Sequence, residues 1–106
     1  MKSKNGSSKS RAIVRYNKAI QSRRGILADR YKVKEIGIFG STVQGRLNNR
    51  SDVDVLVDFS EIPDLLKFIE LELFLEKILK RKVDLVDKQA LRSELRDDIL
   101  RQVVYV

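Results

Sequence analysis

Two short apolar runs with polar residues at their ends constrain this chain more than any other feature of its sequence. The first, Ile36–Phe39, ends at Gly40-Ser41, and after ten further residues Asp52-Val53-Asp54 opens the second run, Val55–Val57. Continuous apolar runs of this length are typical of strands that are covered on both faces of a sheet. The sequence therefore predicts one strand that delivers a Gly-Ser turn and a second strand that presents two carboxylates.

Asp52 and Asp54 are expected to lie on one face of the second strand, because side chains alternate across a strand. A third acid, Asp84, interrupts the apolar run Lys82–Val86, which is predicted to be a third strand. Two acids at this spacing can share a divalent cation, and an acid from a neighbouring strand would complete a site for two metal ions. Without a cation, three clustered carboxylates would repel one another. The alternative is that Asp52 begins the strand, Asp54 faces solvent and Asp84 is incidental.

The Gly40-Ser41 turn favours the functional interpretation of these acids. A glycine at the end of a strand lets a phosphate approach the backbone without a clash with a Cβ atom. Ser41 adds a hydroxyl and a backbone N–H at the start of a predicted helical turn, 42–44, which is a natural anion site. Taken alone, the dipeptide is an ordinary turn, but together with the acids it suits a polyphosphate and its divalent metals.

The absence of Cys and His from the chain excludes thiolate nucleophiles, imidazole bases and ordinary zinc sites. Catalysis would have to use carboxylates, hydroxyls, Lys or a hard metal bound through oxygen, for which Mg²⁺ is the favoured candidate. At 106 residues the chain is predicted to hold a single domain, 11–106. It has no apolar run of membrane-spanning length and no secretory signal, so no membrane partner is expected, and the lack of Cys fits a cytoplasmic location.

Basic residues are concentrated in the N-terminal third of the chain. Residues 1–32 contain ten Lys or Arg and a single acid, Asp29, in a chain of net charge +7. The polar stretch 1–10 is expected to be a disordered basic tail. The basic region either contacts nucleic acid or an acidic partner, or is a solvated tail and helix face.

Apolar spacing predicts a helix before the first strand, beginning after Ser10 as its N-cap and bending or ending near Gly25. A last helix is expected to carry the stripe Leu91, Leu95, Ile99 and Val103. The apolar C-terminal segment 103–106 is expected to pack against the rest of the molecule.

The longest predicted helix, 64–80, has two apolar arcs. The first is expected to face the sheet and comprises Phe68, Leu71, Leu75, Ile78 and Leu79. The second comprises Leu65, Leu66, Ile69 and Leu73. A helix that is apolar on two sides either buries its second side against a partner or makes a thicker contact within its own core.

Gly40-Ser41, ten residues and then Asp52-x-Asp54, each at the end or start of a strand, is similar to the signature of the nucleotidyltransferase superfamily that includes DNA polymerase beta. The later Val-Asp-Leu-Val strand with Asp84 and the small size resemble the minimal nucleotidyltransferase group. The resemblance covers 11–106. It implies an α/β fold with a small mixed β-sheet flanked by helices.

By position, the resemblance implies that Gly40 and Ser41 hold the β- and γ-phosphates of ATP, and that Asp52 and Asp54 bind Mg²⁺, with two ions expected. Asp84 would complete one metal site and help to activate an acceptor hydroxyl, either as a metal ligand or as a general base. The hydroxyl would attack the α-phosphorus, accept a nucleoside monophosphate and release pyrophosphate.

Two positions depart from the pattern of this family. Many relatives carry Arg directly after Gly-Ser and again two residues later, whereas this chain has Thr42 and Gln44. Arg46 or Arg50 is a candidate to replace the missing charge beside the triphosphate.

Minimal nucleotidyltransferases that resemble this chain are commonly encoded beside a small helical HEPN-domain ribonuclease, for which they act as the antitoxin. The resemblance then implies a hetero-oligomer in which AMP is transferred to a tyrosine hydroxyl of the toxin. The second apolar arc of the helix 64–80 matches the need to borrow an acceptor from a partner. The alternatives are a catalytically weak antitoxin that neutralises its toxin by binding alone, and a nucleic-acid-binding or nucleic-acid-extending module that uses the basic N-terminal region.

Overall fold

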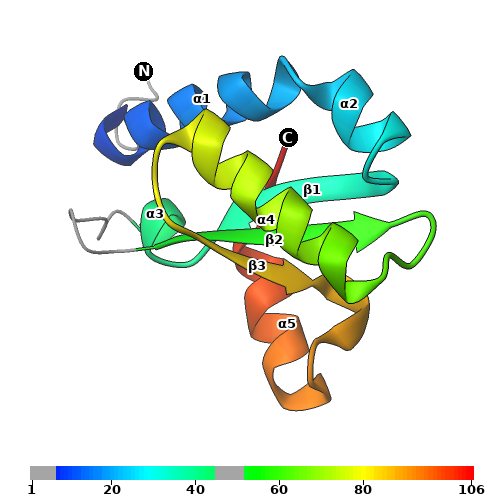
Figure 1. Ribbon diagram of the computed structural model, residues 1–106. Coiled ribbons are helices and arrows are strands. Elements are labelled where there is room, and N and C mark those ends of the chain that lie inside the picture. The colour runs from blue at the N-terminus through cyan, green and yellow to red at the C-terminus, as the bar shows by residue number, and fades with distance from the viewer. Residues whose placement is uncertain (1–6, 45–51) are drawn as a thin grey trace.

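A four-stranded sheet with helices on both faces forms the centre of the molecule (Figure 1). The computed structural model describes residues 7–44 and 52–106, with side chains from Arg11 onward in the first helix. The helices are α1 (Ser7–Gln21), α2 (Arg24–Asp29), α3 (Ser41–Gln44), α4 (Leu65–Leu79) and α5 (Ser93–Gln102), and η2 is a short 3-10 helix (Lys88–Ala90). The strands are β1 (Val33–Phe39), β2 (Val53–Phe59), β3 (Val83–Asp87) and β4 (Val104–Tyr105). None of the described helices is long and apolar enough to cross a membrane.

The sheet is mixed, in the strand order β3-β2-β1-β4. β1 pairs with β2 and with β4 in antiparallel fashion, whereas β2 and β3 are parallel. A parallel pair needs a crossover connection, and α4 supplies it. The predicted α/β class with a small mixed sheet is therefore confirmed. The C-terminal segment packs as expected, because β4 pairs with β1 and the Val106 N–H donates to the Ile36 carbonyl at 2.9 Å.

The alternation predicted for the second strand is confirmed by its burial. Val53, Val55 and Val57 are each 0% exposed and face the core that α1 and α4 cover. Figure 1 shows α1, α2 and α4 on this side of the sheet and α5 on the other. The acids of β2 consequently lie on the α5 side, away from the main core.

The boundaries of α4 follow from its end residues. The Asp64 side chain accepts a hydrogen bond from the Lys67 N–H at 2.8 Å, and Lys80 ends the helix in the left-handed conformation at φ 58°. The first apolar arc faces the sheet, with Leu71 and Leu75 fully buried. The second arc is exposed, with exposed fractions from 41% to 77%, for Leu65, Leu66, Ile69 and Leu73. The alternative of a thicker core contact within the monomer is therefore wrong, and burial against a partner stays a prediction.

Several predicted boundaries need correction. α1 begins at Ser7, so Ser10 lies inside the helix rather than at its N-cap, and 7–10 of the expected 1–10 tail are helical. Residues 1–6 lie outside the described part of the chain. The helix breaks at Ser22–Arg23, ahead of Gly25, which lies within α2. β3 begins and ends one residue later than predicted.

Candidate functional site

Asp54 and Asp84 lie directly beside each other on the two parallel strands. They are Cα partners in the β2–β3 register, and Val53 pairs with Val83 on the core side. Asp52 precedes the first residue of β2 and is exposed, as is Asp84, whereas Asp54 is half-buried. The sheet register thus places Asp54 and Asp84, thirty positions apart in sequence, side by side on neighbouring strands.

The Gly40-Ser41 turn contacts Asp54 directly. Phe39, the last residue of β1, is the Cα partner of Asp54, so the turn that follows passes over the carboxylate. Gly40 has φ +76°, and a Cβ at this position would overlap the Asp54 carboxylate oxygen Oδ2. The Ser41 backbone N–H donates a hydrogen bond to the same carboxylate. Only glycine suits this position, because it tolerates the left-handed conformation and leaves room for the acid.

The environment of Asp54 disfavours its charged form. Burial first, and then the charges of Asp84 and Asp52, raise the pKa of Asp54 from 3.8 to about 6, against the lowering effect of the Ser41 N–H. Desolvation and like charges both favour the protonated carboxyl, whereas a donated hydrogen bond favours the carboxylate. A carboxyl with a strongly raised pKa beside two further acids is a functional-site candidate.

The three acids supply a donor set that suits a hard divalent cation, because they offer oxygen ligands and a local excess of negative charge. Their side chains do not converge on one point. Among the residues of 7–44 and 52–106, no group of three His, Cys, Asp or Glu side chains is close enough to hold a metal ion. The residues therefore fit a cation by chemistry and by backbone position, and ligation by all three would require their side chains to turn inward.

Gln102, at the end of α5, is a residue of this site that sequence reasoning missed. Its side-chain oxygen accepts hydrogen bonds from the Gly40 N–H at 3.2 Å and from the Gln44 side chain at 3.4 Å. Sixty-two residues separate Gln102 from Gly40, and no local pattern signals such a contact. The C-terminal helix thus reaches back and holds the turn that was predicted to bind phosphate.

The positions that depart from the family pattern have distinct surroundings. Thr42 is buried at 1% exposure, and its hydroxyl oxygen has no hydrogen-bond partner in the described part of the chain, so this side chain packs in the interior. Gln44 is exposed and contacts Gln102. Arg46 and Arg50, the proposed substitutes, lie outside the described residues.

A mixed sheet with two acids on its adjacent parallel strands and a Gly-Ser turn against one of them defines a small α/β domain of the kind that transfers nucleotidyl groups. Residues 20–106 match the family model of the nucleotidyltransferase domain. The chain is 58% identical over 80 residues to the protein adenylyltransferase MntA of Thermococcus cleftensis, in an alignment that spans 76% of this chain and 81% of the relative. The chain therefore belongs to the nucleotidyltransferase domain family, within its minimal nucleotidyltransferase group.

Two solved complexes are similar in structure. One is a toxin–antitoxin crystal structure with AMP-PNP, at 30% identity and a TM-score of 0.69, covering 85% of this chain and 70% of the matched chain. The other is a tri-AMPylated Shewanella oneidensis HEPN toxin in complex with an MNT antitoxin, at 26% identity and a TM-score of 0.62, covering 89% of this chain and 70% of the matched chain.

Proposed function

We propose that this chain is a protein adenylyltransferase antitoxin that transfers AMP from ATP to a tyrosine hydroxyl of a HEPN-type toxin. The proposal rests mainly on the position of Asp54. Its carboxylate contacts the Gly40-Ser41 turn, and its pKa is raised by burial and by the charges of Asp84 and Asp52. The named relative and the two similar complexes support the nucleotide and the kind of partner.

The chain's own residues would bind and orient the triphosphate. The Gly40 N–H and the Ser41 hydroxyl would each donate a hydrogen bond to a phosphate oxygen, while the space left by the missing Cβ of Gly40 is taken by the Asp54 carboxylate. Because the Gly40 N–H donates to Gln102 in this structure, a bound phosphate would exchange with the Gln102 oxygen. Mg²⁺ bound by Asp52, Asp54 and Asp84 would neutralise phosphate charge during the transfer.

The transfer itself breaks two bonds, one from phosphorus to oxygen and one from oxygen to hydrogen, and forms two. The acceptor hydroxyl oxygen bonds to the α-phosphorus as the bond from that phosphorus to pyrophosphate breaks, and the hydroxyl proton passes to a base. Asp84 is the proposed base or orienting group, since it is exposed at the edge strand β3 and can be reached by a side chain of another protein. An acid that is within reach of the acceptor proton satisfies the first requirement of a general base.

The exposed second arc of α4 is the proposed docking surface for the toxin. Leu66 is 77% exposed and Leu73 is 59% exposed on a helix that packs against the sheet with its other side. Apolar side chains grouped in this way mark interaction sites on soluble proteins. A partner seated on α4 would extend past the edge strand β3 toward Asp84.

Incubation of the chain with a candidate toxin, Mg²⁺ and ATP labelled at the α-phosphate tests the proposal. We expect label on the toxin, its loss when the acceptor tyrosine is replaced by Phe, and its loss in Asp52→Asn. Tight toxin binding without label transfer would contradict the enzymatic proposal and identify an antitoxin that acts by binding alone. ATP is the expected donor, so unlabelled GTP, CTP or UTP should compete poorly.

The docking surface has its own test. Leu66→Asp with Leu73→Asp should weaken toxin binding at least about tenfold, because each buried leucine contributes about 1.5–3 kcal/mol. Ile26→Asp is the matched control, since Ile26 is 44% exposed on α2, outside α4 and off the side of the sheet that carries the acids. An equal loss in the control would contradict the assignment of α4.

A further inference from the structure

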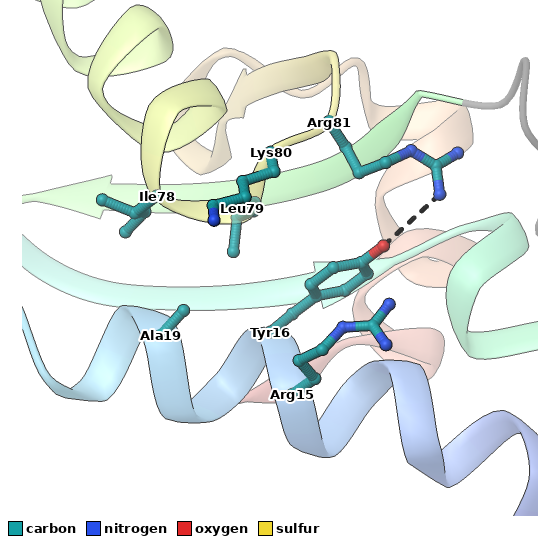
Figure 2. Close-up of a pocket in the computed structure, with 7 residues that line it drawn as sticks. All are labelled: Arg15, Tyr16, Ala19, Ile78, Leu79, Lys80 and Arg81. Carbon is teal, nitrogen blue, oxygen red and sulfur yellow. Dashed lines mark hydrogen bonds between the residues drawn. The ribbon is translucent and has the colours of Figure 1, made fainter.

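A basic groove lies on the α1/α4 side of the sheet, on the face away from the carboxylates. One hollow of about 440 Å³ separates α1 from the end of α4, and a second of about 370 Å³ continues it. The two hollows share Ala19, Ile78 and Lys80, so they form one trough between two helices. Figure 2 shows α1 as one wall and the end of α4 as the other.

The trough is lined by cations on both walls. Arg15 belongs to α1 and Arg23 follows it, while the α4 side contributes Lys77, Lys80 and Arg81. None of the described residues that line either hollow is acidic. The floor is apolar and includes Tyr16, whose hydroxyl accepts a hydrogen bond from Arg81 at 3.5 Å (Figure 2).

The helix α1, which forms one wall of the groove, carries further positive charge on its exposed surface. Arg11 and Lys18 are also exposed on α1, and Asp29 is the single acid within 7–32. The Arg15 guanidinium stacks over the Tyr16 ring at 5.3 Å, which holds this charge at the rim of the groove. A domain with pI 9.9 and cations gathered on one face has the electrostatic footprint of a nucleic-acid-binding protein.

We propose that this groove binds the phosphate backbone of a single-stranded nucleic acid, without sequence preference. Cations on two facing walls can contact successive phosphates of one strand that lies along the trough. Phosphate contacts carry no base information and little information on the sugar, so RNA and DNA strands are both expected to bind. A carboxylate-bearing protein segment would present charge at lower and less regular density.

Part of the positive charge that lines the groove also has a structural role at the end of α4. Lys77 and Lys80 lie at the C-terminal end of α4, where cations interact favourably with the helix dipole and stabilise the fold slightly. Arg15 lies in the middle of α1 and has no such role. A test must therefore separate stability from ligand binding.

Fluorescence anisotropy with a labelled single strand of about twelve nucleotides measures the proposed binding. If about four phosphates are contacted, raising salt from about 50 to 200 mM should weaken binding by about 50-fold. Arg15→Glu with Lys77→Glu should weaken it at least about tenfold more than Lys34→Glu with Arg92→Glu, a control pair of exposed cations outside the groove.

The same measurements can overturn the proposal. An equal loss in the control pair would show that net charge alone is responsible, and a poly-glutamate chain that competes as well as the strand would identify a carboxylate surface. Thermal unfolding of each variant reports any loss of fold. Asp54→Asn must bind the strand normally, so failure of the proposed AMP transfer and failure of this groove are distinguishable.

Discussion

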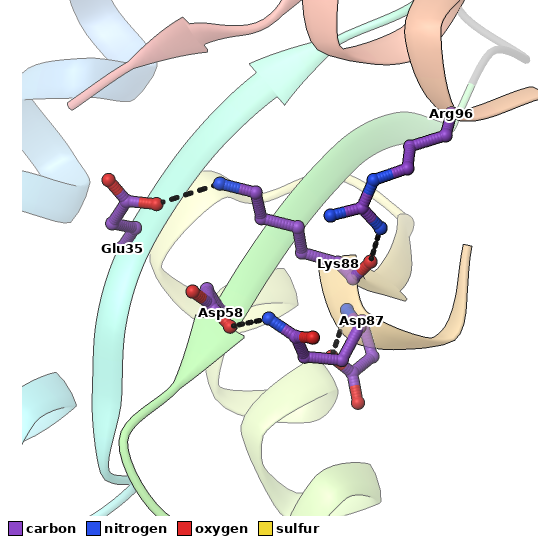
Figure 3. Close-up of polar contacts among 6 residues, drawn as sticks. Glu35, Asp58, Asp87, Lys88 and Arg96 are labelled. Atoms are coloured by element: carbon purple, nitrogen blue, oxygen red, sulfur yellow. Dashed lines mark hydrogen bonds and ion pairs between the residues drawn. The ribbon is translucent and has the colours of Figure 1, made fainter. Parts of the chain in front are cut away.

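Asp54 and Asp58 lie four residues apart on the same face of β2, yet their surroundings are opposite. Asp58 is 7% exposed, and its Oδ1 accepts a hydrogen bond from the Gln89 side chain at 3.1 Å (Figure 3). Asp54 receives one backbone hydrogen bond but faces two like charges, and its burial together with these charges raises its pKa to about 6. A hydrogen bond from a neutral donor offsets part of the cost of burying an acid, whereas neighbouring carboxylates add repulsion to that cost.

The rest of the Asp58 end is tied together by complementary contacts. The Lys88 ammonium pairs with Glu35 across the sheet at 3.1 Å, and Asp87 accepts from the Gln89 N–H at 3.0 Å. The Arg96 guanidinium donates to the Lys88 carbonyl at 3.2 Å (Figure 3). The strand β2 thus has a satisfied end at Asp58, where polar groups are paired, and a repulsive end at Asp54, where like charges are neighbours. The repulsive end is the candidate site.

The strongest test of this comparison between Asp54 and Asp58 is to neutralise each acid in turn. Asp54→Asn should lower AMP transfer by on the order of 10²–10³-fold, since a ligand of the proposed Mg²⁺ is lost. Asp58→Asn keeps its acceptor oxygen for Gln89 and should leave transfer within about twofold, measured as initial rates of labelled AMP incorporation. Comparable losses in both variants would mean that Asp54 acts through the fold.

A second test uses alanine substitutions at two glycines, one beside Asp54 and one in α2. Gly40→Ala forces a Cβ onto the Asp54 carboxylate in a left-handed backbone, and should cost about 2–3 kcal/mol of unfolding free energy together with most of the transfer activity. Gly25→Ala meets no atom within 4 Å in helix α2, and should stabilise by about 0.5–1 kcal/mol. Urea unfolding measures both changes, and destabilisation by Gly25→Ala would contradict the helical argument.

The burial of Asp54, together with the repulsion from Asp84 and Asp52, predicts a pH-dependent stability. Because its folded pKa is about 6 and its ordinary value is 3.8, its contribution is fully present below about pH 4 and is lost as pH rises through 6. In EDTA, Asp54→Asn should therefore match the natural chain at pH 4 and exceed it at pH 8 by about 1–2 kcal/mol, after allowance for water screening.

Thermal unfolding at the two pH values measures this difference. Mg²⁺ at pH 8 should raise the melting temperature of the natural chain more than that of Asp54→Asn, because the cation relieves the repulsion that the variant has already lost. A stability difference that is the same at both pH values would contradict the electrostatic cause.

The contrast between the two ends also separates what sequence could predict from what it could not. Alternation in β2 placed Val53 in the core and Asp54 on the opposite face, because the side-chain period of a strand is fixed. Motif spacing predicted a Gly-Ser turn and three acids as the site, and the register of β2 on β3 places two of those acids, Asp54 and Asp84, side by side. These inferences needed only local patterns and one strand pairing.

Contacts between distant elements were beyond such patterns. The Gln102 contact with Gly40 depends on how α5 lies against the sheet, and Gln89 reaches Asp58 only after η2 forms. The exposure of Leu66 likewise depends on which side of α4 packs against the sheet. Sequence periodicity separated the two arcs of α4 and predicted that the first faces the sheet, but it left open whether the second is buried within the monomer, because that depends on the tertiary contacts.

The smallest expected effect is a change in the free energy of unfolding that is opposite in sign to the change expected for Asp54→Asn. Glu35→Gln also removes one negative charge from the sheet, but from a pair in which a hydrogen bond to Glu35 raises the pKa of Lys88. Glu35 is 45% exposed, so the loss should be below about 1 kcal/mol, and the glutamine oxygen keeps an acceptor for the ammonium. Urea unfolding at pH 8 in EDTA should then show a small destabilisation by Glu35→Gln and a stabilisation by Asp54→Asn. If both changes had the same sign, net charge rather than local pairing would control this sheet, and the distinction between its satisfied and repulsive ends would fail.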